Sequence, residues 1–454
     1  MKKENGFAGE KVSLKNALVH GDFMTKGSAL IMGLGIFHKK QRVKGLLVLL
    51  LQVAFIFYMA TTGLLALSNL PGLGDSAQQK VWNEAKQIYE YTAGDNSQLI
   101  LLHGVVTLFV VLAFIVLWVL QLRTAYRLQV MAAKNKKINN FVEDLKSLLN
   151  ENLHRTLMTL PVLGILVFNI VPLVYMISMA FTSYSKEDEH LLLFDWNGLT
   201  QFKRVLNLGG NIGKQFWQVL LWTVIWAILA TFLNYILGMI LAMIINRRDT
   251  KLKGFWRFCF VISIAVPQFI SLMIMNIMLQ PQGAVNVILE NLGLISQPLP
   301  FWTDAMWARV TIIVINLWVG IPYTLVQVTG ILQNIPGELY EAARIDGAGP
   351  AKIFTSITLP YMLFVTTPYL IVTFVGNINN FNIIYLLSGG GPTRVGDTAG
   401  QTDLLVTWLY KLTIDQQYFN LGAVIGILTF IMLTTITLVT YRRSKSYKNE
   451  EAFM

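Results

Sequence analysis

The sequence predicts an all-α, polytopic membrane protein with eight transmembrane helices. Only 13% of its 454 residues are charged, while 54% are hydrophobic; an ordinary soluble domain carries about 25% charged residues. A membrane-spanning helix needs roughly 20 consecutive, mostly apolar residues. Eight runs meet this requirement, and they lie at 45–67, 99–121, 157–181, 217–245, 255–280, 306–332, 359–387 and 419–441.

The distribution of basic residues indicates the membrane topology. The net charge is +11, but Lys and Arg concentrate in alternate connecting segments. These segments are 1–44, 122–156, 246–257 and 442–454, whereas 281–305 contains neither residue type. Because basic loops stay on the cytoplasmic side, we expect a cell-membrane protein with both termini in the cytoplasm. The surplus charge is explained by topology and gives no reason to expect nucleic-acid binding.

Two short features bear on local structure near the membrane. Residues 27–37 read "GSALIMGLGIF" and precede a basic stretch. This segment could lie in the membrane interface or form a mobile arm, and the sequence leaves both interpretations open. The single cysteine, Cys259, falls inside an apolar run. Because a lone cysteine forms no disulfide within the chain, we expect it to pack in the core.

The stretch between the sixth and seventh runs is polar and rich in small residues. Residues 337–360 are GELYEAARIDGAGPAKIFTSITLP. Pro336 suits the first turn of a helix, Gly347 can adopt the left-handed conformation that ends one, and Pro350 can begin the next. We therefore expect a helix–turn–helix on the cytoplasmic side. Periodicity alone leaves open whether it rests on the bilayer surface or docks a cytoplasmic partner.

Part of this stretch resembles the EAA loop of ABC-importer permeases, whose pattern is EAA, a later Gly, and I-x-L-P. The matching residues are Glu341, Ala342, Ala343, Gly347, Ile357, Leu359 and Pro360. The resemblance implies that residues 341–347, Asp346 included, form a coupling helix. In the family this helix seats in a groove of a separate ATPase subunit and transmits nucleotide-driven closure to the membrane helices.

Three further stretches resemble the MalF-type permeases of the maltose/maltodextrin uptake family. They are NLWVGIPYTLVQVTGILQNIPGELYEAARIDGAGP, NINNFNIIYLLSGGGP and TDLLVTWLY. The resemblance implies a type I ABC-importer permease core of six helices preceded by two additional helices. Enteric members carry a large external insertion after the third helix, and the loop at 182–216 is too short to contain one.

The resemblance also implies a division of the chain into four segments. These are a cytoplasmic basic segment at 1–44, two additional helices with a cytoplasmic loop at 45–156, the permease core at 157–441 with the coupling loop at 337–360, and a cytoplasmic basic tail at 442–454. Prolines 267, 322 and 368 fall within the fifth, sixth and seventh runs. Proline kinks a helix, which suits either alternating access or a static bend.

Polar residues inside the sixth and seventh runs are candidates for a substrate site. Two sets share a helix face at i, i+4 and i+7; they are Asn316, Gly320 and Tyr323, and Thr373, Asn377 and Asn380. Amides and hydroxyls both donate and accept hydrogen bonds, as sugar hydroxyls do. Spacing alone leaves two alternatives equally open, a neutral sugar site and hydrogen bonding between helices.

The resemblance to MalF-type permeases favours the sugar site. The positions that it implies are Asn316, Val319, Gly320, Tyr323, Thr373, Gly376, Asn377 and Asn380. Thr373 stands where the family has a serine and Val319 where it has a leucine. Gly376 replaces an aromatic residue that stacks on a glucosyl ring. Because that stacking surface is lost, we expect a longer or differently placed oligosaccharide.

The sequence lacks the motifs of ATP hydrolysis and of common enzymes. A phosphate-binding loop needs G-x-x-x-x-G-K-[ST], and GGNIGKQ at 209–215 has the wrong glycine spacing. The five histidines are scattered, and neither H-E-x-x-H nor G-x-S-x-G occurs. We therefore expect no catalytic residue, metal or cofactor in this chain, with ATP and Mg bound by a partner ATPase.

These observations predict a non-catalytic permease subunit of an ATP-driven importer for oligosaccharides, with maltose or maltodextrin as the first candidate. The implied partners are a second, MalG-like permease, a MalK-like ATPase dimer, an extracellular solute-binding protein and membrane lipid. Galacto- or arabino-oligosaccharides are alternative substrates. A membrane enzyme acting on glycans and a proton-coupled transporter are alternative classes. A proton-coupled transporter needs ionisable groups in the middle of the membrane, and the central runs contain almost none.

Overall fold

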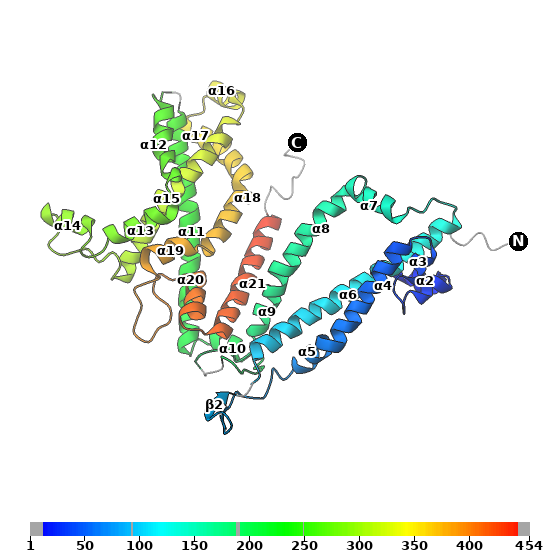
Figure 1. The fold of residues 1–454 in the computed structure, drawn as a ribbon. Helices are drawn as coiled ribbons and strands as arrows, with labels where there is room; N and C mark the ends of the chain where they lie inside the picture. Colours follow the sequence, from blue (N-terminus) through cyan, green and yellow to red (C-terminus); the bar gives the residue numbers. More distant parts are fainter. Residues whose placement is uncertain (1–11, 92–93, 188–190, 248, 444–454) are drawn as a thin grey trace. The chain divides into compact units, whose positions relative to one another are not determined.

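The computed structural model describes residues 12–91, 94–187, 191–247 and 249–443 (Figure 1). The terminal parts of the two predicted basic segments, 1–11 and 444–454, lie outside the described residues. The chain forms two compact units. One comprises Met1–Tyr184 with Asp188–Gly198, and the other comprises Ser185–Glu187 with Leu199–Met454. We refer to them as unit 1 and unit 2.

Unit 1 is helical except for one short antiparallel hairpin. Its helices are α1 (Leu14–His20), α2 (Phe23–Gly27), α3 (Leu34–His38), α4 (Arg42–Tyr58), α5 (Leu64–Asn69), α6 (Ser97–Ala133), α7 (Phe141–Leu149), α8 (Leu153–Ile165) and α9 (Val171–Met179). The π-helical turns η1 (Met59–Gly63) and η2 (Leu166–Ile170) join α4 to α5 and α8 to α9. Strand β1 (Lys80–Asn83) pairs with β2 (Ile88–Tyr91), with Lys80 opposite Tyr91.

Unit 2 is helical throughout its described elements. They are α10 (Thr200–Leu206), α11 (Asn211–Asn246), α12 (Lys253–Ala265), α13 (Gln268–Met278), α14 (Ala284–Asn291), α15 (Ala305–Gln333), α16 (Gly337–Ile345), α17 (Pro350–Ile353), α18 (Leu359–Ile378), α19 (Phe381–Ser388), α20 (Leu405–Tyr410) and α21 (Phe419–Arg443). The π-helical turns η3 (Phe354–Thr358) and η4 (Lys411–Asp415) follow α17 and α20.

Seven of the eight predicted spans appear as helices long and apolar enough to cross a membrane in the described part of the chain. They cover Arg42–Asn69, Ser97–Ala133, Leu153–Met179, Asn211–Asn246, Ala305–Gln333, Pro350–Ser388 and Phe419–Arg442. The fifth predicted span is instead a pair, α12 and α13, bent by 88°. Pro267 caps α13 at this break, where its missing N–H cannot continue the helix. Pro322 and Pro368 lie inside continuous helices.

The segment at 27–37 is packed against α6, so its interpretation as a mobile arm is wrong. Met32 and Ile36 are buried. Polar side chains of α6 also bind its backbone: Gln121 Nε2 donates to the carbonyl of Ser28 at 2.8 Å, and Trp118 Nε1 donates to that of Ala29 at 2.9 Å. These contacts leave Leu30 exposed, as the membrane-interface alternative expects.

Helix α11 is the centre of unit 2 and packs against both α15 and α18 (Figure 1). Close approach depends on small residues, as is usual between membrane helices. A Cβ atom on Gly238 would lie 2.6 Å from Cβ of Thr324, and one on Gly320 would lie 2.3 Å from Nδ2 of Asn234. Glycine is therefore required on both sides of the contact between α11 and α15.

Two hydrophobic clusters surround this contact. The first includes Trp222, Trp226, Leu272, Ile312 and Ile384, and the second includes Tyr235, Met239, Leu325, Val328 and Met362. The first cluster joins α11 and α15 to α13 and α19, and the second joins them to α18. Cys259, expected in the core, is instead exposed on α12, because α12 contributes none of the buried residues of these clusters.

The packing of α11 on α15 predicts the effect of enlarging Gly238. Gly238→Leu should destabilise the protein by about 1–3 kcal/mol, because a well-packed contact has no room for added carbons. The thermal midpoint of the detergent-solubilised protein measures the effect. Gly330→Leu is the matched control, since a Cβ at Gly330 of α15 meets no atom within 4 Å. Equal midpoints for the two variants would contradict the proposed contact.

Candidate functional site

The predicted sugar-binding residues lie on α15, on α18 and at the start of α19. Asn316 and Asn377 are buried, with 3% and 8% of their surfaces exposed. Val319 packs against the cluster around Trp226. By contrast, Tyr323 is 52% exposed, and a Cβ on Gly376 would meet no atom within 4 Å. The set therefore divides into residues inside unit 2 and residues on its surface.

Asn377 links three helices through hydrogen bonds. Its Nδ2 donates to Thr231 Oγ1 of α11 at 3.0 Å, and its carbonyl accepts from Trp226 Nε1 at 3.1 Å. Asn380 Nδ2 approaches Asn377 Oδ1 at 3.5 Å, and Asn380 Oδ1 caps α19 by accepting from the backbone N–H of Ile383 at 3.3 Å. These contacts fit the alternative of hydrogen bonding between helices for Asn377, and a sugar contact there stays a prediction.

Asn316 differs from Asn377 because its donor is not used. Its Nδ2 is buried without a hydrogen-bond partner in the described part of the chain, and so is Oδ1 of Asn234 on α11. Asn234 Nδ2 donates to the carbonyl of Ala230 at 2.7 Å, and its side chain lies against Gly320. Buried polar groups almost always have partners, so these two atoms retain free hydrogen-bonding capacity within the candidate site.

Sequence reasoning missed Asn234, although a signal was present. It is one amide within the long apolar run at 217–245, and polar groups inside a membrane usually face the bundle interior or a wet cavity. The signal was weak because no second amide lies at helical spacing from Asn234 in its own run. Its relation to Gly320 depends on how α11 packs on α15, which the sequence does not reveal.

The predicted coupling segment forms the expected helix–turn–helix. Helix α16 ends at Ile345, Asp346 caps it, and Gly347 takes the left-handed conformation with φ +77°. Helix α17 then continues through η3 into α18. Tyr340 OH and Thr358 Oγ1 are 3.2 Å apart, which connects α16 to the start of α18.

The outer surface of α16 is available to a partner. Glu341 and Ala342 are exposed, Ala343 is half-buried, and Ile345 is 86% exposed. Leu339, Ala342 and Ile345 follow one another at intervals of three residues, so they share one side of the helix. An apolar side chain as exposed as Ile345 next to a carboxylate suits a docking surface better than a solvated loop.

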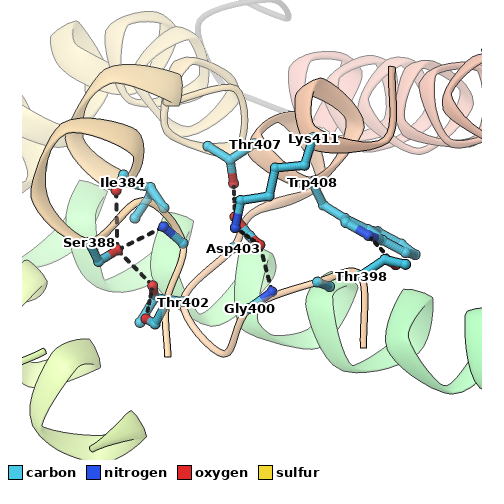
Figure 2. Close-up of polar contacts among 12 residues, drawn as sticks. Ile384, Ser388, Thr398, Gly400, Thr402, Asp403, Thr407, Trp408 and Lys411 are labelled. Atoms are coloured by element: carbon cyan, nitrogen blue, oxygen red, sulfur yellow. Dashed lines mark hydrogen bonds and ion pairs between the residues drawn. The ribbon is translucent and has the colours of Figure 1, made fainter. Parts of the chain in front are cut away.

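A polar network orders the loop between α19 and α20 (Figure 2). Asp403 is fully buried and accepts from Lys411 Nζ at 2.7 Å, from the Gly400 N–H at 2.6 Å and from Thr407 Oγ1 at 2.9 Å. Burial raises the pKa of the Asp403 carboxyl above its usual value, and Lys411 acts in the opposite direction. The motif TDLLVTWLY thus supplies the carboxylate of a buried ion pair, and the cation, Lys411, directly follows the motif.

Arg309, near the start of α15, is bound within unit 2. Its Nε donates to the carbonyl of Gln401 at 3.0 Å, and its guanidinium lies 4.7 Å from the ring centre of Trp222. A cavity of about 240 Å³ lies beside it and is also lined by Arg394 and Gln218. Arg309 therefore connects the loop between α19 and α20 to α15 and to α11.

Known proteins are similar to this chain in sequence. A family model described as a binding-protein-dependent transport system inner membrane component matches residues 234–445. The galactooligosaccharides transport system permease protein GanP of Bacillus subtilis (strain 168) is 34% identical over 432 residues, which covers 93% of this chain and 97% of that protein. The maltodextrin transport system permease protein MdxF of the same organism is 35% identical over 435 residues, covering 93% and 96%.

A solved structure shows the same fold. It is a crystal structure of a bacterial ABC transporter involved in the import of the acidic polysaccharide alginate. The matching chain superposes with a TM-score of 0.52 at 22% identity, and the match covers 66% of this chain and 97% of that chain. At this identity the likeness concerns the fold alone.

The helical membrane fold, the coupling segment and these matches define a membrane permease. The chain belongs to the family of binding-protein-dependent transport system inner membrane components. It is a non-catalytic, multi-pass permease subunit of an ABC importer, and membership implies an ATPase, a second permease and a solute-binding protein as partners. The resemblance seen in the EAA loop and in the MalF-type stretches is confirmed.

The buried ion pair predicts a large effect of a small change. Asp403→Asn should destabilise unit 2 by about 3 kcal/mol, because it leaves the Lys411 ammonium without its counter-charge in a buried site. Thermal unfolding monitored by the loss of monodisperse protein measures this. Glu187→Gln is the matched control: the Glu187–Arg204 pair is half-exposed and should contribute less than about 1 kcal/mol.

A paired change makes the interpretation specific. Asp403→Leu with Lys411→Met should cost less than Asp403→Asn alone, because it removes both buried charges together. If the double variant is the less stable one, the ion pair is not what orders this loop.

Proposed function

We propose that this permease imports neutral oligosaccharides, with maltodextrins as the first candidate and galactooligosaccharides as the second. The relatives support this pair of substrates, since MdxF and GanP match with nearly equal identity over nearly the whole chain. The amides of Asn316 and Asn377 and the phenol of Tyr323 supply donors and acceptors suited to sugar hydroxyls. Uptake assays over a panel of labelled oligosaccharides test the substrate class directly.

The proposed chamber is formed by the exposed faces of α15 and α18 together with a second, MalG-like permease. Tyr323 and Gly376 lie on the surface of unit 2 and are free to face that subunit. The buried donor of Asn316 lies one helical turn from Gly320 on the same face of α15. We assign sugar contacts to Asn316, Val319, Gly320, Tyr323, Thr373, Gly376, Asn377 and Asn380, with Asn377 also connecting the helices.

The proposed motor is a MalK-like ATPase dimer that binds ATP and Mg, and α16 docks on it. The exposed positions Glu341, Ala342 and Ile345 support this assignment, together with Asp346 and Gly347 at the turn. A ligand shifts a conformational equilibrium only by its difference in affinity for the two states. Accumulation of sugar therefore requires the work of ATP hydrolysis on the partner chains.

The proposed topology follows the distribution of Lys and Arg. Both termini and the coupling segment lie in the cytoplasm, and the loop between α19 and α20 faces outward, where a solute-binding protein delivers sugar. The segment boundaries at 44, 156 and 441 belong to the same proposal. Single cysteines can be introduced into each loop of the Cys259→Ser variant. Their labelling by a membrane-impermeant reagent tests the orientation of each loop.

Reversing the charge of Glu341 tests the docking role. Glu341→Arg should abolish sugar-stimulated ATP hydrolysis by the purified complex. We expect the ATPase to contact the negative charge of Glu341, and the variant replaces that charge by a positive one. Glu290→Arg makes the same charge change on the exposed surface of α14 and should leave the stimulation unchanged. Full activity in Glu341→Arg, with normal membrane insertion of both variants, would refute the role of α16.

Filling the space at Gly376 tests the substrate pose. Gly376→Phe restores an aromatic ring without a clash, because a Cβ there meets no atom within 4 Å. The uptake rate of shorter oligosaccharides relative to longer ones should rise about tenfold. This ratio corresponds to the free energy of about one aromatic stacking contact. Gly330→Phe, also in open space, controls for added bulk. An unchanged preference across chain lengths would count against the assignment.

A further inference from the structure

Unit 1 contains a cavity that the transport function does not use. Its volume is about 370 Å³, and it lies between the start of α4, the end of α6 and the segment from α7 to α8. The first span begins here, the second ends here and the third begins here. All three ends belong to the same membrane surface, so the cavity lies at the depth of lipid headgroups.

The lining of the cavity combines charged and apolar side chains. Lys44, Arg127 and Arg155 contribute positive charge, and Asp144 and Glu151 contribute negative charge. Lys44 Nζ is 3.0 Å from Asp144 Oδ2, whereas Arg127 and Arg155 form no ion pair within the described residues. The lining therefore has an excess of one positive charge, which complements a phosphodiester with a single negative charge.

Gln41 orders the wall of the cavity. The residue is part of the lining and only 3% exposed. Its Nε2 donates to the Asn139 carbonyl at 3.0 Å and to Asp144 Oδ2 at 2.9 Å. These bonds hold the start of α4 against α7 and fix the Asp144 carboxylate next to Lys44. Arg127 and Arg155 are left as the lining cations that can bind an anion.

Helix α7 places the cavity against the bilayer. Asn140 and Glu143 form a capping box at its start, and Val142, Leu145 and Leu149 are exposed on one side of the helix. An amphipathic helix of this kind lies in the membrane interface with its apolar side in the acyl region. Leu145 and Leu148 also line the cavity, so a lipid headgroup can enter while its chains stay in the membrane.

We propose that this cavity is a binding site for an anionic phospholipid with a single negative charge. Arg127 and Arg155 bind its phosphodiester, and Leu145 and Leu148 of the lining contact its acyl chains. Basic pockets between membrane helices are known sites for anionic headgroups. The apolar part of the lining distinguishes this pocket from a site for soluble anions.

The test measures lipid retention by the intact importer in nanodiscs, using native mass spectrometry. Arg127→Gln with Arg155→Gln should reduce the retention of phosphatidylglycerol about thirtyfold, from two lost charge contacts. Lys134→Gln with Lys136→Gln removes the same charge from exposed positions of the same loop that do not line the cavity. Equal losses in the two double variants would overturn the site, since they would reflect surface charge alone.

Two probes identify the ligand chemistry in the unmodified protein. Phosphatidylglycerol should be retained about fivefold better than phosphatidylcholine, whose headgroup cation neutralises its phosphodiester. Equal retention would overturn the role of the lining cations. Water-soluble glycerophosphoglycerol should not displace the lipid at equal concentration, because it lacks the acyl chains that α7 places in the membrane. Displacement at equal concentration would overturn the assignment to a membrane lipid.

Discussion

A hydrocarbon bilayer offers no hydrogen-bond partner, and this constraint decides how unit 2 is built. Helices satisfy their own backbones, but polar side chains inside the membrane also need partners, on their own helix or on another one. Helix α11 provides such partners for α18. Thr231 accepts from Asn377, and Tyr235 OH lies 2.7 Å from Thr366 Oγ1. Hydrogen bonds thus connect α11 to α18, while the glycines at 238 and 320 let it approach α15. The placement of the other helices of unit 2 depends on this three-helix contact.

The same three helices carry the proposed sugar positions, so structural and recognition roles are divided among neighbouring residues. Asn377 is engaged by Thr231 and contributes to packing whether or not sugar binds. Asn316 keeps a buried donor without a partner in the described residues, and Tyr323 and Gly376 lie on the surface. If a residue is already hydrogen-bonded to its own chain, that bond must break before the residue can bind a sugar. An unpaired donor can bind a sugar without losing a hydrogen bond. On these grounds Asn316 is the stronger candidate for a direct sugar contact.

Local features of the sequence, namely apolar runs and single prolines and glycines, predicted the spans and the helix–turn–helix. Both depend on chemistry within a short stretch of the chain. Apolar runs of sufficient length produced seven spans, Pro267 placed the break of the bent pair, and Gly347 ended α16 as expected. Features that depend on contacts between distant segments were missed. Asn234 meets Gly320 only because α11 packs on α15. The pair of Asp403 and Lys411 is local, but its burial depends on the helices around it and was not predicted either. Cys259 was assigned to the core from the apolarity of its run, which does not distinguish the buried side of a membrane helix from the exposed side.

The proposed coupling segment leads into the helical span that carries part of the proposed recognition site. Residues Pro350–Ser388 form a single helical span, and Tyr340 connects α16 to Thr358 near its start. From Thr358 to the positions 373–377 the rise of 1.5 Å per residue gives roughly 25 Å. A rigid helix would transmit a displacement of α16 over this distance without intermediate contacts. Pro368 lies between the two sites and removes one backbone hydrogen bond, so it is the point where bending would separate them. The hydrogen bonds of Thr366 and Asn377 to α11 lie on either side of it, which restrains the helix at the one position where its own backbone is weakest.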